Sequence, residues 1–320
     1  MKGISKIFLI LLALLLCFAM LSGCVNPIEI KYIFGRNNMS FTSLLQPMQK
    51  VSIRIELESQ TKAEYPIGVS KIGGNPDLPS GFEWFYYQGK TYEGITENRP
   101  LSFLAQINCE EASKYDEESI LPTNGMLYFF YELATMTWGF DPKDRGSAKV
   151  YFFPGNTSEL HRTEFPSDLL EAYRIPEIII SFSSKKELPD FEEFIEYHDG
   201  FNYKQWDDYD KAKYKIIPES EEDSITKLLG YANLIQNGML LQCELTANGI
   251  YTGNSDGYSK VTKQQKENSS KWQLLFQLDS IRTKTYEMLW GDVGRIYFYI
   301  KSDDLKEQNF DDTWLILQCY

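Results

Sequence analysis

The alternation of apolar and polar residues predicts a chain built mainly from short β-strands. In the first clear example, Val51, Ile53 and Ile55 fall on one face of a strand, while Ser52 and Arg54 fall on the other. Similar runs predict further strands at 101–107, 125–132, 148–154, 176–183, 239–246, 272–279, 294–301 and 313–319. We therefore expect an α+β, β-rich fold that is mostly antiparallel and carries a few short helices.

Helical patterns are fewer, and they are acidic. Residues 189–197 predict one helix and residues 220–229 another, in which Ser220 and Asp223 are spaced as in a capping box. A polar run at 203–215 joins the two halves of the chain. Residues 254–270 predict a long polar loop, or a loop followed by a helix.

The chain also contains an internal repeat. Three segments recur in the same order, and the second and third of them are 24 residues apart in the first half and 22 in the second: IGGNPDL (72–78) with LLGYANL (228–234), LSFLAQINC (101–109) with WQLLFQLDS (272–280), and GMLYFFY (125–131) with GRIYFYI (294–300). This pattern predicts a duplicated β-rich unit with repeats at about 65–160 and 225–320. A cleft between two such halves is a natural place for a ligand.

The same segments resemble the YwqG-like family of bacterial proteins. KIGGNPDLPSGFEW (71–84), NGMLYFFYE (124–132) and WGFDPKDRGSAKVYFF (138–153) resemble its first half, and WGDVGRIYFYIKSDDL (290–305) and FDDTWLILQCY (310–320) its second. The resemblance implies one YwqG-like domain over 51–320, mixed but β-rich and internally duplicated. It supplies no catalytic residues, because none are assigned in the family. At Trp84 a phenylalanine follows where proline is frequent in the family, and members mostly lack an export leader.

The N-terminus has the pattern of a bacterial lipoprotein signal. Lys2 and Lys6 precede an apolar run at 7–20, which is shorter than the roughly 20 residues that cross a bilayer as a helix. The run is followed by Leu21-Ser22-Gly23-Cys24, which resembles a lipobox. We expect residues 1–23 to be removed, Cys24 to carry the lipid, and residues 24–50 to form a tether. These features predict a location in the cell envelope, on the extracytoplasmic face of a membrane.

Composition and charge narrow the class of partner. With 43% apolar residues and a high aromatic share of 15%, the chain can form a substantial core. The formal net charge is −13, which becomes −15 once Lys2 and Lys6 are removed. Because nucleic-acid binding needs a basic surface, we expect no nucleic-acid partner.

Three cysteines remain in the mature chain beyond the lipid-bearing one. Cys109, Cys243 and Cys319 all lie in apolar context, which favours buried thiols. One disulfide stays possible because the compartment is oxidising.

The sequence lacks the motifs of common catalytic centres. Only His161 and His198 are present, and neither stands in a zinc-binding or nucleophile-activating pattern. We therefore predict no metal site and no cofactor.

Aromatic residues beside carboxylates remain as candidate ligand-binding residues. Trp138, Asp141 and Asp144 occupy one dense loop, and Trp290 with Asp292 echoes it in the second half. Rings and carboxylates suit hydroxyl-rich or cationic ligands, so we expect them to approach one concave surface. The alternative is that the aspartates cap turns and the tryptophans are buried in separate cores.

Two glutamines hold equivalent places in the repeats. Gln106 and Gln277 each lie between apolar neighbours on a predicted strand. A buried amide needs hydrogen-bond partners, so we expect the backbone to supply them, although a pair of cleft-lining amides is the alternative.

These features favour a lipid-anchored binding or protein-interaction module of unknown biochemical activity. One alternative is a carboxylate-dependent enzyme acting on a glycan or another hydroxyl-rich substrate. Another is an immunity-type partner of a basic toxin, because an acidic surface speeds association with a basic protein.

Overall fold

A ten-stranded sheet organises residues 48–320 in this computed structural model, which describes residues 40–58, 65–218 and 225–320. Its strands lie side by side in this order: β16 (Trp314–Gln318), β15 (Arg295–Lys301), β12 (Trp272–Asp279), β11 (Lys227–Leu229), β1 (Lys50–Leu57), β10 (Ile178–Glu187), β2 (Lys71–Ile72), β6 (Ser102–Asn108), β7 (Met126–Tyr131) and β8 (Ala148–Phe153). Every pairing between them is antiparallel.

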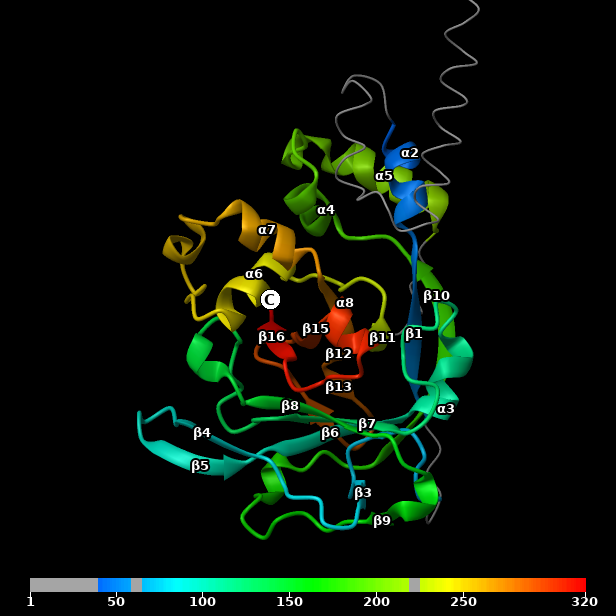
Figure 1. Ribbon diagram of the computed structural model, residues 1–320, viewed down its shortest axis with the longest axis vertical. Coiled ribbons are helices and arrows are strands. Elements are labelled where there is room, and N and C mark those ends of the chain that lie inside the picture. Colours follow the sequence, from blue (N-terminus) through cyan, green and yellow to red (C-terminus); the bar gives the residue numbers. More distant parts are fainter. Residues whose placement is uncertain (1–39, 59–64, 219–224) are drawn as a thin grey trace, which may run out of the picture. The chain divides into compact units, whose positions relative to one another are not determined.

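The two halves of the sheet have the same strand order, counted from the centre of the sheet to each edge. Strands β2, β6, β7 and β8 follow one another on one side, and β11, β12, β15 and β16 follow one another on the other. The central strands are exchanged: β1 precedes β2 in the chain but pairs with β11, while β10 precedes β11 but pairs with β2. Figure 1 shows β1 and β10 side by side between the two halves. The predicted α+β, β-rich and internally duplicated fold class is confirmed.

Register and irregularities match between the halves. Gln106 lies opposite Tyr128, and Gln277 lies opposite Tyr297. In β6 and in β12 the pairing register shifts two residues before the glutamine, at Leu104 and at Leu275 respectively. Two unrelated hairpins would have no reason to carry a bulge at the same place.

The two glutamines make the same contacts. The side-chain oxygen of Gln106 accepts from the Asp77 amide at 2.8 Å, and that of Gln277 accepts from the Asn233 amide at 2.9 Å. Their side-chain nitrogens donate to the carbonyls of Val69 and Ile225. Backbone partners for these amides, as predicted from the sequence, are confirmed.

The main core lies between the inner faces of the two halves. Phe129 of β7 packs on Phe276 of β12 and Phe298 of β15, with ring centroids 4.4 and 5.2 Å apart. The outer faces carry separate clusters. Phe130 and its neighbours form the cluster of the first half, and Trp272, Tyr299 and Ile316 belong to that of the second.

Small sheets and short helices pack around the large sheet and connect its strands. The small sheets pair β3 (Asp77–Pro79) with β9 (Leu160–Arg162), β4 (Tyr86–Lys90) with β5 (Thr96–Pro100), and β13 (Ile281–Arg282) with β14 (Glu287–Met288). The helices are α3 (Cys109–Ala112), α4 (Phe191–Tyr197), α5 (Trp206–Ile216), α6 (Leu240–Ala247), α7 (Lys263–Ser269) and α8 (Ser302–Lys306). Figure 1 shows α6 and α7 together above the second half.

Two sequence-based assignments are wrong. Residues 239–246 form helix α6 rather than a strand, because a short apolar run with buried residues on most sides has no diagnostic period. Residues 227–229 form strand β11 rather than the end of a helix. The capping box predicted at Ser220 lies outside the described residues. The loop-plus-helix alternative for 254–270 is confirmed by α7.

The N-terminal part forms a separate unit, which spans Met1–Pro47. Its described residues contain α2 (Phe41–Leu45), whose N-terminus is capped by the Ser40 side chain. The predicted signal at 1–23 and Cys24 lie outside the described residues, as does most of the predicted tether at 24–50. Across the described part of the chain, no helix has the length and apolar character needed to cross a membrane.

Candidate functional site

A cleft of about 730 Å³ opens over strand β16 in the second half of the sheet. This volume falls in the range of ligand pockets, roughly 300–1,000 Å³. Five parts of the chain form its walls: the loop at 138–140, helix α4, Tyr203 in the turn before α5, the segment 236–242 that leads into α6, and the segment 252–258. Its floor is formed by Ile316, Leu317 and Gln318 of β16.

The floor residue Gln318 fixes the wall beside it. Its side-chain oxygen accepts from the amides of Ile235 and Gln236 at 3.0 and 3.1 Å, and its side-chain nitrogen donates to the Asn237 carbonyl at 2.9 Å. Gln236 in turn donates to the carbonyl of Cys319. One buried amide thus holds the polar loop 235–237 over the end of the sheet, which gives the cleft a preformed wall.

The wall at 138–140 comes from the first half of the chain and closes the free edge of β16. The Trp138 carbonyl accepts from the Leu317 amide at 3.2 Å, and the Trp314 indole donates to the Gly139 carbonyl at 2.8 Å. Gly139 has a φ of +78°, and a Cβ there would overlap the Leu315 carbonyl, so only glycine fits. The Trp138 side chain, 37% exposed, remains available to a ligand.

Helix α4 contributes two carboxylates, Glu192 and Glu196. Four residues apart, they lie on one face of the helix with Cβ atoms about 6 Å apart. Burial raises the pKa of Glu196 to about 7, against the lowering effects of the Leu241 amide and of Lys266. Burial also raises the pKa of Glu192, and Asp190 adds to the shift. The cleft therefore holds one carboxyl group, that of Glu196, whose ionisation changes near neutral pH.

Segment 252–258 completes the walls and is tied to the tryptophan loop. The Thr252 amide donates to the Phe140 carbonyl at 2.9 Å, and the Thr252 and Thr246 hydroxyls share a hydrogen bond at 2.9 Å. Tyr258 lines the cleft from this segment. The aromatic lining thus comes from segments far apart in sequence.

Of the five candidate binding residues, only Trp138 lines this cleft. Asp141 accepts from the Lys143 amide at 2.9 Å and caps a 3-10 turn, and Asp144 accepts from the Gly139 amide at 2.9 Å. Burial raises the pKa of Asp144 to about 6. For these two aspartates the observed contacts are those of turn-capping residues.

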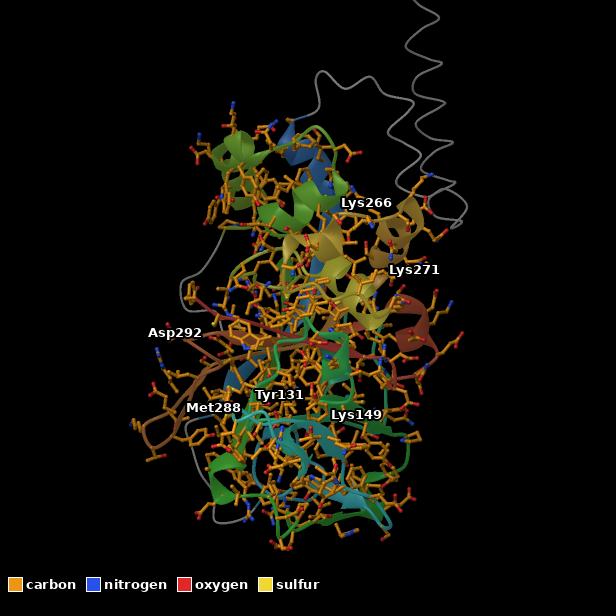
Figure 2. All side chains as sticks on the ribbon, turned by 90° about the vertical axis from the view of Figure 1, so that its left-hand side faces the viewer. Tyr131, Lys149, Lys266, Lys271, Met288 and Asp292 are labelled. Carbon is orange, nitrogen blue, oxygen red and sulfur yellow. The ribbon has the colours of Figure 1, made fainter. Side chains whose placement is uncertain are left out.

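Trp290 and Asp292 lie elsewhere. The Trp290 side chain is fully buried in the main core, where its indole donates to the Asp279 carbonyl at 3.0 Å. Asp292 is exposed, and Figure 2 shows it on the opposite side of the view from Lys266, the α7 lysine whose charge acts on Glu196. The expectation that these residues share a concave surface with Trp138 is therefore wrong.

The physical reason is that the two loops are not equivalent. Trp138 lies between the third and fourth strands of its repeat, β7 and β8, whereas Trp290 lies between the second and third, β12 and β15. A shared Trp-Gly pair suggested a correspondence that the strand order does not support.

The sequence also missed Glu192 and Glu196, because an acidic turn at a helix start ordinarily indicates a solvated helix end. A signal was present in Phe191, Phe194 and Ile195, which leave the two glutamates on the border of an apolar face.

Other reactive groups serve packing. Cys109, Cys243 and Cys319 are free, buried thiols. His198 stacks on Phe194 with ring centroids 4.1 Å apart, and its Nδ1 contacts the Phe194 carbonyl at 2.7 Å. Across residues 40–58, 65–218 and 225–320, no three His, Cys, Asp or Glu side chains are grouped to hold a metal ion.

The model of a protein family, a domain of unknown function (DUF1963), matches residues 70–319. The chain belongs to this family. The DUF1963 match begins one residue before β2 and ends one residue after β16, so it contains both halves of the sheet but not strand β1. A search of curated proteins finds no significant match.

Proposed function

We propose that this DUF1963 protein is a binding module that takes a small polar ligand into the cleft over β16. The observation that carries the proposal is the cleft itself, about 730 Å³ in volume and lined by aromatic rings and side-chain amides. Rings offer flat apolar area, while amides offer both donors and acceptors, and this combination suits hydroxyl-rich ligands. The walls are held by backbone hydrogen bonds, so the site needs little reorganisation to bind.

The proposal is tested with a panel of neutral sugars, polyols and small amines, by calorimetry on the whole mature chain. Trp138→Ala should weaken binding of any hit by at least about fivefold, because a ring supplies ~1 kcal/mol or more of contact. Tyr86→Ala is the matched control, since Tyr86 is 42% exposed and lies outside the cleft lining. Equal binding by the two variants would refute the site.

The N-terminal pattern, in which this chain departs from most members of the YwqG-like family, extends the proposal to location. The protein would be held by a lipid on Cys24 at the extracytoplasmic face of a membrane, after removal of residues 1–23. Support comes from the apolar run at 7–20 and the Leu21-Ser22-Gly23-Cys24 motif. Intact mass of the native protein should show a lipid-bearing Cys24 as the first residue, and Cys24→Ala should abolish detergent-phase partitioning. A native mass with unmodified Cys24 would contradict the anchor.

One observation favours an enzyme as the second candidate. Glu192 and Glu196 line the same cleft one helical turn apart, and both pKa values are raised, as a general acid requires. Hydrolysis of chromogenic glycosides should then occur and should fall by about a hundredfold or more in Glu196→Gln. Turnover that does not depend on Glu196 would exclude it as the acid.

A further inference from the structure

The charged side chains that line the cleft are all of one sign. Glu192 and Glu196 are its two carboxylates, and none of its lining residues is a lysine, an arginine or a histidine. The protein as a whole has a formal net charge of −13. The cleft is therefore unfavourable for an anionic ligand at both short and long range.

The two lysines whose charges act on these carboxylates form ion pairs with other residues. Lys213, whose charge acts on Glu192, pairs with Asp190 at 2.7 Å. Lys266, whose charge acts on Glu196, pairs with Asp199 at 3.6 Å. Among the described residues, neither Glu192 nor Glu196 forms an ion pair, and Glu196 is stabilised in its ionised form only by the Leu241 amide, the more distant charge of Lys266 and the Tyr197 hydroxyl. A bound cation can therefore supply the missing counter-charge.

The walls around the carboxylates are aromatic. Trp138, Phe140, Tyr203 and Tyr258 line the same cleft, and Trp138 and Phe140 are neighbours, with ring centroids 6.4 Å apart. The face of an aromatic ring carries partial negative charge and attracts a cation. Rings and carboxylates together form the lining that recognises a substituted ammonium group, since the alkyl substituents contact the rings while the charge is balanced by the glutamates.

We infer that the cleft binds a small organic cation, in which a positively charged nitrogen lies between the α4 carboxylates and the aromatic walls. This inference rests on the proposed function, because it names the ligand class of the same cleft. A neutral hydroxylated ligand would fill the volume but leave two carboxylates close together without a counter-charge.

Binding should depend on pH. Burial holds the pKa of Glu196 at about 7, and the facing groups are the Leu241 amide, the Lys266 ammonium and the Tyr197 hydroxyl. A cation binds the ionised carboxylate, so affinity should rise as pH rises from 6 to 8. A permanent cation separates this effect from titration of the ligand.

The test is calorimetric titration of the whole mature chain with choline, ethanolamine and 3,3-dimethylbutan-1-ol, the uncharged isostere of choline. At pH 8 at least one of the two cations should bind at least about tenfold more tightly than the uncharged isostere. Glu192→Gln/Glu196→Gln should reduce that difference to less than about threefold. Glu93→Gln, which removes one charge from an exposed turn, should leave it unchanged. Comparing choline with ethanolamine decides between a quaternary and a primary ammonium.

The outcomes separate this inference from the proposed function. If the isostere or neutral sugars bind in a Trp138-dependent way while neither cation binds more tightly, the cation inference fails and the binding site stands. Cation binding that survives both glutamate substitutions also overturns the inference. If no probe, charged or neutral, binds in a Trp138-dependent way, both proposals fail.

Discussion

The two outer faces of the duplicated sheet are built on equivalent strands but are covered differently. On the first half, Phe130 of β7 contacts four rings, those of Phe82, Trp84, Phe85 and Phe103, at centroid distances of 5.2–5.9 Å. On the second half, the matching face lies under α6 and under the cleft. One copy of the unit is filled with rings, and the other leaves about 730 Å³ open.

The last strand of each repeat accounts for much of this difference. Tyr151 of β8 lies opposite Tyr128, and Ile316 of β16 lies opposite the equivalent Tyr297. Two residues further along, Phe153 corresponds to Gln318. Tyr151 and Phe153 pack among aromatic rings in the first half. Their counterparts in the floor of the cleft are the smaller Ile316 and the polar Gln318. If the cleft is the binding site that we propose, duplication lets one half carry stability while the other carries the site.

The largest expected effect comes from the filled face. Phe130→Ala should lower the free energy of unfolding by about 3–5 kcal/mol, because it leaves a cavity among packed rings. Trp138→Ala, in the cleft wall, should cost less than about 1 kcal/mol, since its side chain already contacts solvent and its backbone contacts remain. Urea unfolding of both variants checks the contrast, and similar losses would contradict it.

Replacing either of the two equivalent glutamines should cost the same stability. Gln106→Leu and Gln277→Leu each leave one backbone amide and one backbone carbonyl without a hydrogen-bond partner. Each substitution should therefore lower the free energy of unfolding by about 2–4 kcal/mol. The measurement is chemical denaturation of the two variants beside the wild type. A loss in one half more than about 2 kcal/mol larger than in the other would mean that the two amides are not equivalent.

A third prediction concerns Glu193, which is buried beside the cleft in α4. Burial raises its pKa from 4.5 to about 7, despite the opposing charge of Lys50. The folded state thus holds this proton more tightly than the unfolded state, and stability is lost as pH rises from 4.5 to 7. Glu193→Gln cannot ionise. Its stability relative to wild type should rise by about 2–3 kcal/mol between pH 4 and pH 8. Thermal unfolding at both pH values checks this, with Glu93→Gln as control; a constant difference would contradict it.

The smallest change in stability is expected at Tyr299, the counterpart of Phe130. Tyr299 stands where Phe130 stands in the first half, and its hydroxyl is buried without a hydrogen-bond partner among the described residues. Tyr299→Phe should therefore raise the free energy of unfolding by about 1 kcal/mol. A loss of stability in denaturant titrations would show that the hydroxyl is satisfied in solution.

The sequence predicted the strands where burial imposes a clear pattern. β12 was placed at its observed bounds, and β6, β7, β8, β15 and β16 within one residue or so, because each is a continuous apolar or alternating run. The paired glutamines were found because polar residues inside such runs are conspicuous. Helix α6 was missed, since its buried residues surround most of the helix and give no diagnostic period.

The exchange of β1 and β10 could not be read from local sequence. Strand pairing at that distance is decided by long-range packing, and either partner would satisfy the same pattern of side chains. The site was mostly missed for a related reason. Trp138 was found, but Glu192 and Glu196 become neighbours of it only through the fold, and an acidic helix start looks solvated in sequence.

The most direct test is a crystallographic fragment screen on the whole mature chain. This screen compares ligand binding at the two outer faces of the sheet in one experiment. We expect ligand density over β16, between Trp138 and Glu196, and none over the ring-filled face at Phe130. Repeated binding at other surfaces with an empty cleft would contradict the claim that the second half carries the site.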